Sequence, residues 1–137
     1  MRLIARLAVL VALLPAPALA QNTQAFYDNY LALRARLDTL VKNRDIAEVM
    51  PAFGDQSDPD ELEALELRVR EIYPRDFENV ALIRRHDMDH GFRQELIAFW
   101  VGGQYIYVYL LLHDREDGIV ALGFNFNSDF DELNTKF

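Results

Sequence analysis

The chain has 137 residues, no cysteine, and 22 acidic residues against 14 basic ones, which gives a formal net charge of −8 at pH 7. A surface with this excess of carboxylates repels phosphate backbones and anionic lipid head groups, which argues against nucleic acids and anionic membranes as partners. Without cysteine the fold has no disulfide, so its stability must come from a hydrophobic core.

The first twenty residues have the three parts of a secretory signal peptide. Arg2 and Arg6 precede a short apolar run, and Ala18-Leu19-Ala20 places small residues where signal peptidase reads the chain. The apolar run is shorter than the roughly 20 residues that a spanning helix needs. We therefore predict a signal peptide over 1–20, cleaved after Ala20, with an uncleaved membrane anchor as the alternative.

The mature chain, residues 21–137, has the length of one domain. Export without cysteines fits a bacterial periplasm, and we predict that location. Loss of the two leader arginines leaves 12 basic and 22 acidic residues, so the mature formal charge is −10.

Apolar residues between 21 and 44 recur at steps of three and four, which predicts one long amphipathic helix. Asn22 or Thr23 is the expected cap at its start. The predicted apolar face consists of Phe26, Tyr30, Leu33, Leu37, Leu40 and Val41.

Two further helices are predicted before Pro74. Asp45 and Glu48 have capping-box spacing for a short second helix. Asp58 followed by Pro59 opens a third helix, which Pro74 ends. The expected inner face of this third helix consists of Leu62, Leu65, Val69 and Ile72.

After Phe77 the hydrophobic period changes from about 3.6 to two, which predicts strands. Gly102-Gly103 and Asp117-Gly118 are turn signals between apolar runs, and such short connections require antiparallel neighbours. We predict an α+β fold in which the helices pack on one face of a four-stranded meander. The predicted strands cover residues 77–86, 92–101, 104–113 and 119–126.

The Gly102-Gly103 turn also fixes which residues share a face of the sheet, because it sets Val101 opposite Gln104 and Trp100 opposite Tyr105. Neither resulting face is polar, and three helices can cover only one. The other face must meet a pocket, a second subunit or the C-terminal tail. One face collects Phe92, Leu96, Ala98, Trp100, Tyr105, Tyr107, Tyr109 and Leu111, and the other collects Ile97, Phe99, Ile106, Val108, Leu110 and Leu112, with Arg93 and Glu95 at one end.

The aliphatic face is the harder of the two to leave in water, so we expect the helices to cover it. Tyrosine and tryptophan combine apolar area with a polar group and are enriched at protein interfaces. The aromatic face is therefore predicted to be a homodimer or partner surface first and the wall of a ligand pocket second. Its predicted binding residues are Phe92, Trp100, Tyr105, Tyr107 and Tyr109.

The order of elements resembles the nuclear-transport-factor-two-like, or cystatin-like, α+β superfamily over residues 24–130. The resemblance is carried by a long helix with "AFYDNYL", short helices, and an antiparallel meander ending in "GFNFN". It is similar above all to small exported bacterial members. The resemblance implies a curved sheet that wraps the long helix around a conical cavity, and dimers through the outer sheet face. The Asp/His and Asp/Arg pairs of the superfamily's enzymes have no match here, so no catalytic residue is carried over.

The segment "HDMDH" is the densest group of potential metal ligands. His86, Asp87, Asp89 and His90 offer imidazoles and carboxylates that divalent ions accept. Four neighbours in one turn rarely converge on one ion, and a solvated hairpin loop explains their polarity more simply. We predict no bound metal and no cofactor, with these four as the only candidate ligands.

Two more polar groups have a functional and a structural interpretation. His113 at a strand end could act as a general base, but an ordinary strand-end polar residue is the favoured interpretation. Glu95 could pair with Arg84 or Arg93, and arginines there could clamp an anion, although a cross-strand ion pair is favoured. The predicted function is a non-enzymatic exported interaction protein. The alternative is a small-molecule cavity, with or without catalysis, between the long helix and the sheet.

Overall fold

The computed structural model describes residues 25–137, an α+β fold built on an antiparallel five-stranded sheet with the strand order β1-β5-β4-β3-β2. The predicted signal peptide and the predicted caps Asn22 and Thr23 lie outside the described residues. No helix between residues 25 and 137 is long and apolar enough to cross a bilayer. The elements are β1 (Ala25–Tyr27), α1 (Tyr30–Lys42), α2 (Ile46–Ala52), α3 (Pro59–Ile72), β2 (Asn79–Asp87), the 3₁₀ turn η1 (Asp89–Gly91), β3 (Phe92–Val101), β4 (Gln104–Arg115), β5 (Gly118–Asn127) and α4 (Phe130–Asn134).

The start of the predicted long helix is a strand, so the expected count of four strands was wrong. β1 pairs antiparallel with β5, with Tyr27 opposite Ile119. The Tyr27 hydroxyl donates to the Ala52 carbonyl at 2.8 Å, which ties this strand to the end of α2. The helix then begins at Tyr30, where the Asn29 side chain caps it by accepting from the Ala32 amide at 2.8 Å. Phe26 therefore belongs to β1 and not to the helix face.

The second and third helices begin where the sequence predicts. Asp58 caps α3 by accepting from the Asp60 amide at 2.8 Å. Asp45 precedes α2 but forms no cap hydrogen bond and pairs with Arg70 at 2.8 Å. Ile72 was expected on the inner face of α3 but is 56% exposed, because in the last turn Val69 and the following Tyr73 are the residues that enter the main core.

The three meander connections have the predicted antiparallel pairing. Val101 lies opposite Gln104 and Trp100 opposite Tyr105, across a turn in which Gly102 has the left-handed φ of +56°. The pairing is interrupted at two points, at Ile83 on β2 and at Leu122 on β5, each of which is skipped in the register with its neighbouring strand. Such bulges increase the local twist of a sheet.

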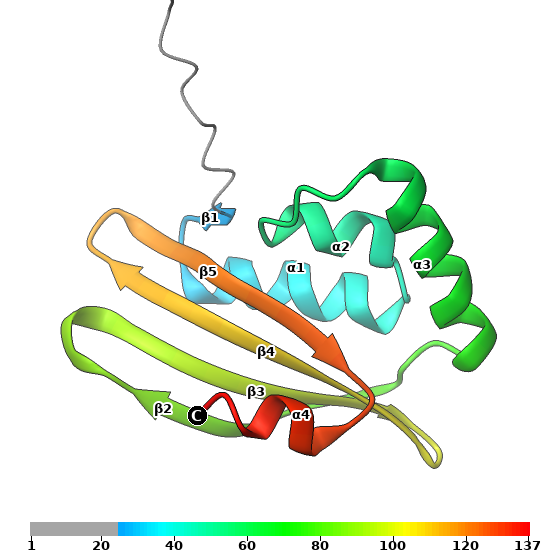
Figure 1. Cartoon of the computed structure of the whole chain (residues 1–137). Coiled ribbons are helices and arrows are strands. Elements are labelled where there is room, and N and C mark those ends of the chain that lie inside the picture. Colours follow the sequence, from blue (N-terminus) through cyan, green and yellow to red (C-terminus); the bar gives the residue numbers. More distant parts are fainter. Residues whose placement is uncertain (1–24) are drawn as a thin grey trace, which may run out of the picture.

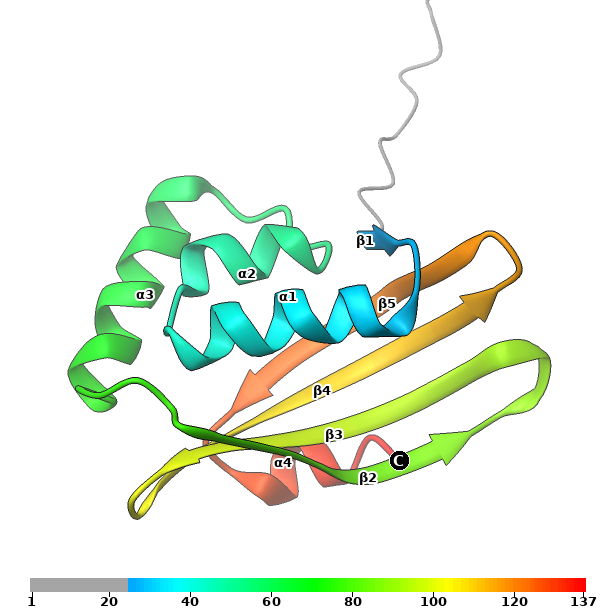
Figure 2. The same ribbon diagram turned by 180° about the vertical axis from the view of Figure 1, so that it is seen from behind.

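The helices and the C-terminal tail lie on opposite sides of the sheet. Figures 1 and 2 show α1, α2 and α3 over one face, here called the inner face, and α4 against the other, the outer face. Apolar side chains of α1 and α2 fill the space above the sheet. The main core cluster includes Leu33, Leu37, Val41, Val49, Phe53, Ile97, Phe99, Val108, Leu110 and Leu112.

Candidate functional site

The aromatic residues that the sequence singles out lie on the outer face, opposite α1 to α3. Trp100, Tyr105, Tyr107, Tyr109 and Phe92 alternate along β3 and β4 with side chains that enter the main core. Cross-strand partners share a face, so the pairing places all five rings on the same side. They do not form one site, because α4 divides the face and Phe92 lies at the far end of β3 from Trp100.

α4 covers the middle of the outer face. Leu133 of α4 packs with Leu96 and Tyr109 in a second, smaller cluster, and the Phe137 ring meets the Tyr109 ring edge-on at 5.7 Å. Gln94 fixes the tail by donating to the Tyr109 hydroxyl at 2.9 Å and to the Lys136 carbonyl at 2.7 Å. Tyr109 is thus a packing residue of the tail and not part of an open surface.

The rest of the outer face forms the aromatic patch, a term used here for Ala81, Ile83, Ala98, Trp100, Tyr105 and Tyr107. These residues line a shallow hollow of about 330 Å³. The Tyr105 ring stacks against Trp100 at 6.2 Å and against Tyr107 at 6.4 Å between centroids. Tyr105 is 45% exposed, and Ile83 beside it is exposed to the same extent. The patch therefore leaves a contiguous aromatic and aliphatic surface in water.

The opposite end of the outer face holds Phe92 and His113. Their rings stack at 3.9 Å, and the His113 Nε2 atom lies 3.0 Å from the His90 carbonyl oxygen. The ring stack joins β3 to β4 as a cross-strand contact, and the contact with His90 joins β4 to η1. His113 is therefore engaged in packing, and it does not line the hollow formed by Ala81, Ile83, Ala98, Trp100, Tyr105 and Tyr107.

The candidate metal ligands are spread along a turn. His86 and Asp87 end β2, where Asp87 pairs with Arg85 at 3.0 Å. Asp89 and His90 belong to η1, and His90 has a left-handed φ of +61° that turns the chain. Within residues 25–137, no three His, Asp or Glu side chains gather in a group that could hold a metal ion.

A buried polar cluster lies beneath α1. The sequence analysis named Glu95 and Arg93 as one possible pair but missed the part that Tyr30 and Arg34 play in it. Glu95 is fully buried on the inner face, where it lies 3.0 Å from Arg93 and accepts a 2.7 Å hydrogen bond from the Tyr30 hydroxyl. Arg34 donates to the same Tyr30 hydroxyl at 2.9 Å and pairs with Asp38 at 3.2 Å. The signal available in the sequence was a glutamate at an inward position of a strand.

The pKa shifts in this cluster are those expected of buried side chains that are hydrogen-bonded to one another. Burial raises the pKa of the Tyr30 hydroxyl, which stays a neutral donor to Glu95. Burial by itself would lower the pKa of Arg34, but the bonds to Tyr30 and Asp38 outweigh it and the pKa is raised. The Arg93 guanidinium also lies over the Tyr30 ring at 4.5 Å. These contacts anchor the first turn of α1 to β3.

The three arginines considered for anion binding do not converge. Arg93 points inward to Glu95, while Arg84 lies on the outer face, where it contacts Asn134 and stacks on the Phe137 ring at 4.2 Å. Arg85 pairs with Asp87. Glu95 therefore pairs with Arg93 and not with Arg84. The favoured interpretation of a cross-strand pair was wrong, because both partners lie on β3, and the pair is buried.

Comparisons with known protein families, with curated proteins and with solved structures find no match to this chain. The aromatic patch is the surface that combines the sequence-predicted residues with exposure, and it is the candidate functional site.

Proposed function

We propose that this chain is an exported interaction protein that self-associates through the aromatic patch. The observation that supports this most directly is the unequal cover of the two sheet faces. α1 to α3 bury the aliphatic face, whereas α4 covers only part of the aromatic one and leaves Tyr105 and Ile83 in contact with water. Exposed apolar patches of this kind mark interaction sites in proteins.

A second copy of the chain is the occupant that best fits the patch. Its lining residues carry no charge, so two identical surfaces meet without like-charge repulsion even though the mature chain is strongly acidic. Sheet faces pack about 10 Å apart with interdigitating side chains, and a two-fold axis makes one patch complementary to itself. The resemblance to the nuclear-transport-factor-two-like superfamily, which remains part of this proposal, implies dimers through the same face.

The alternative, a ligand cavity between the long helix and the sheet, has less support. Leu33 and Leu37 of α1 are completely buried against the sheet. Close packing at these two residues fills the space between this part of the helix and the sheet. The same face carries Glu95 and Arg93, which are already paired.

Sedimentation equilibrium of residues 21–137, from low micromolar to submillimolar concentration, tests the proposal. The native chain should form a dimer, and Ile83→Glu or Tyr105→Glu should weaken it by at least about tenfold because each buries a carboxylate in an apolar interface. Leu31→Glu is the matched control, because Leu31 is 80% exposed on α1, away from the patch.

A native chain that is monomeric throughout that range would overturn self-association. Equal weakening by Leu31→Glu and by Ile83→Glu would show that the dimer uses another surface. Circular dichroism of each variant checks that the fold is retained.

A further inference from the structure

The aromatic patch is uneven along the direction of its strands. Trp100 and Tyr105 are cross-strand partners next to the Gly102-Gly103 turn, and their large rings are here called the ridge. One step further from the turn, Ala81 and Ala98 are cross-strand partners that line the hollow with small side chains. The patch therefore has a raised end near the turn and a low region beside it.

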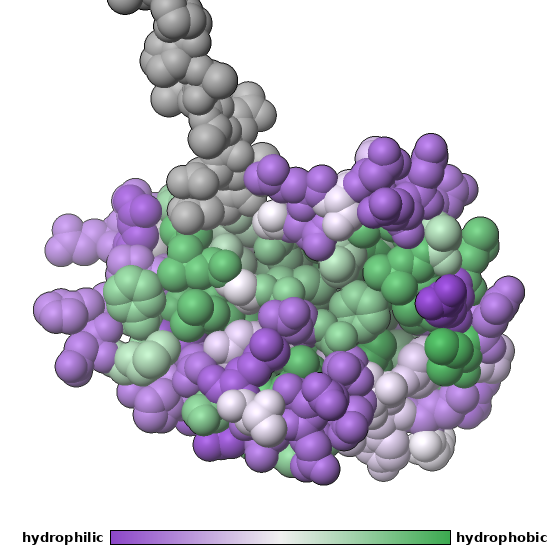
Figure 3. All heavy atoms as spheres, viewed as in Figure 1, coloured by the Kyte–Doolittle hydropathy of each residue, from purple (hydrophilic) through white to green (hydrophobic). Residues whose placement is uncertain are grey.

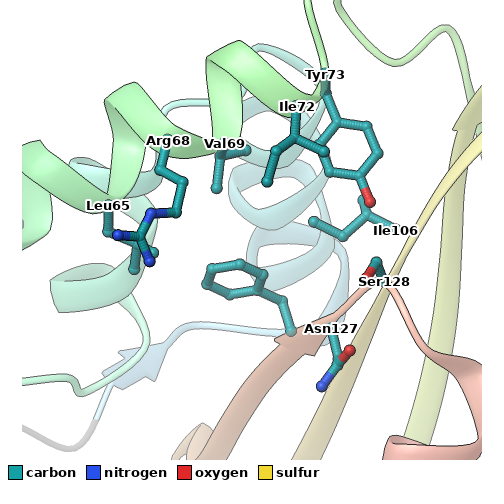
Figure 4. Close-up of a pocket in the computed structure, with 9 residues that line it drawn as sticks. Leu65, Arg68, Val69, Ile72, Tyr73, Ile106, Asn127 and Ser128 are labelled. Carbon is teal, nitrogen blue, oxygen red and sulfur yellow. The ribbon is translucent and has the colours of Figure 1, made fainter.

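The backbone of the ridge is held from the inner face. The hydroxyl of Tyr73, which follows the end of α3, donates to the Tyr105 carbonyl at 2.9 Å. Figure 4 shows this hydroxyl close to Ser128 and Ile106, at one side of a cleft of about 270 Å³ between α3 and the sheet. A ridge that is fixed in this way loses little conformational freedom when a partner packs on it.

α4 stands on the outer face at the other end of the patch. It begins beside β4, where the Phe130 ring meets the Tyr107 ring edge-on at 5.6 Å, and it ends near β2, where Asn134 accepts from Arg84. Figure 3 shows mostly hydrophilic residues over this helix. A helix is about 10 Å across and packed sheets lie about 10 Å apart, so α4 fills the space that a facing sheet would need.

These differences in height restrict how two copies can pack patch to patch. The two limiting orientations of a two-fold axis in such an interface are parallel to the strands and across them. An axis parallel to the strands sets α4 against α4 and ridge against ridge, which keeps the sheets apart. An axis across the strands turns one copy end for end. Each ridge then faces the partner's hollow, and each α4 lies beyond the partner's Gly102-Gly103 turn.

The two ends that meet in this second orientation offer a free cation and a free carboxylate. The Arg75 guanidinium lies at the turn, because a Cβ at Gly102 would be 2.9 Å from its Nη2 atom. Asp131 is exposed on α4. Neither side chain has an ion pair or hydrogen bond with another residue in the range 25–137, so both are available to a partner.

We propose that the dimer inferred above is assembled end for end. The Trp100–Tyr105 ridge of each copy packs into the partner's hollow, and Arg75 lies beside the partner's Asp131. This inference rests on the proposed self-association and adds to it an orientation and two contacts outside the patch, the Gly102-Gly103 turn and α4. α4 thus decides which orientation two copies adopt, besides covering part of the outer face.

Chemical cross-linking reads this orientation directly, because the native chain has no cysteine. Gly103→Cys and Asp131→Cys are made as separate variants of residues 21–137, mixed at a concentration at which the native chain is dimeric, and treated with a short bismaleimide. The mixed cross-link should form at least about tenfold faster than that between Gly103→Cys and Leu31→Cys, since only the first pair is held together in the dimer. Leu31 is a suitable control because it is 80% exposed on α1.

Charges placed at the turn provide a second, independent measurement. Gly103 has no positive φ and open space around it, so the turn accepts a side chain there. Gly103→Lys should dimerise at least about threefold more tightly than Gly103→Glu in sedimentation equilibrium, because the partner's Asp131 lies opposite. Adding Asp131→Lys to both variants should abolish or reverse that order, whereas a general effect of net charge would leave it unchanged.

The outcomes separate this inference from the proposed function. A native chain that is monomeric in sedimentation equilibrium overturns both. If Ile83→Glu weakens the dimer but Gly103→Cys cross-links fastest to itself, the aromatic patch is retained as the interface and the end-for-end orientation is wrong. The orientation is equally wrong if the cross-link to Asp131→Cys forms no faster than the one to Leu31→Cys. It is also wrong if Asp131→Lys leaves the order of the two charged Gly103 variants unchanged.

Discussion

The two faces of the sheet are both apolar, but they are covered in different ways. On the inner face, α1 to α3 bury an aliphatic surface in one continuous cluster and even cover an ionised pair completely. On the outer face, a single short helix packs on an aromatic surface and leaves one end open. Aliphatic side chains have no polar group to expose, whereas Trp and Tyr tolerate a half-wet position. The distribution of residue types thus separates the face that is fully covered from the face that is partly exposed.

From this comparison we expect the largest loss of stability when the buried Glu95–Arg93 pair of the inner face is broken. Glu95→Gln should lower the free energy of unfolding by about 3–5 kcal/mol, because it removes the nearest counter-charge of the buried Arg93 and leaves only Asp114, at 4.0 Å. Glu48→Gln is the control, since Glu48 pairs with Arg36 at 2.8 Å at an exposed position and should cost about 1 kcal/mol or less. Urea unfolding of both variants measures the difference. Similar values for the two would show that α1 does not shield the Glu95 pair from water.

Neighbouring leucines on β4 provide the next test, because they point to opposite faces. Leu110 is fully buried in the main core, whereas Leu111 is only partly buried beside α4. Leu110→Ala should lower the free energy of unfolding by about 2–5 kcal/mol, because it leaves a cavity in a packed core. Leu111→Ala should lower it by clearly less. Chemical denaturation compares the two. A larger loss at Leu111 would mean that the outer face carries the fold.

The contact between α4 and the sheet should be weaker than the main core. Leu133 is the buried residue of α4, and its cluster is small. Leu133→Ala should cost about 2 kcal/mol, at the low end for such substitutions, because a five-residue terminal helix relaxes easily. Released from the sheet, the tail would expose Tyr109 and Leu96 and raise the binding of an apolar fluorescent dye. If Leu133→Ala lowers the free energy of unfolding without raising dye binding, α4 does not act as a cover for this face.

The sequence predicts much of this fold because most of its signals are local. Period-two patterning locates the four meander strands, and the Gly102-Gly103 turn sets the pairing of Trp100 with Tyr105. β1 is missed because Phe26 continues the helical spacing of the residues that follow. Only the tertiary bond from Tyr27 to Ala52 and the pairing with β5 decide between strand and helix there.

The candidate site is predictable only in part, for a related reason. Alternation shows that Trp100, Tyr105, Tyr107 and Tyr109 share a face, but it does not show where a five-residue tail will lie. The tail covers Tyr109 and leaves Tyr105 open. The inward ion pair of Glu95 is equally non-local, because its third member, Tyr30, lies 65 residues away in sequence. Contacts between distant segments leave no spacing pattern to read.

The smallest effect expected from the comparison concerns three tyrosines on the inner side. Each hydroxyl donates one hydrogen bond. Tyr27 donates to the Ala52 carbonyl at 2.8 Å, and Tyr30 donates to the Glu95 carboxylate at 2.7 Å. Tyr73 donates to the backbone carbonyl of Tyr105 at 2.9 Å. Burial raises the pKa of all three hydroxyls above the ordinary value.

A raised pKa in the folded state stabilises the fold below the pKa of the unfolded chain, about 10, and this contribution is lost as the pH rises toward the folded value. The free energy of unfolding should therefore fall above about pH 10. Phenolate absorbance should show these hydroxyls ionising later than in the unfolded chain. In Tyr73→Phe the free energy of unfolding should fall less steeply with pH than in the native chain. Both proteins have the same lysines, so the titration of lysine does not contribute to this difference. If the variant loses stability as steeply as the native chain, the Tyr73 hydroxyl does not contribute to this pH dependence.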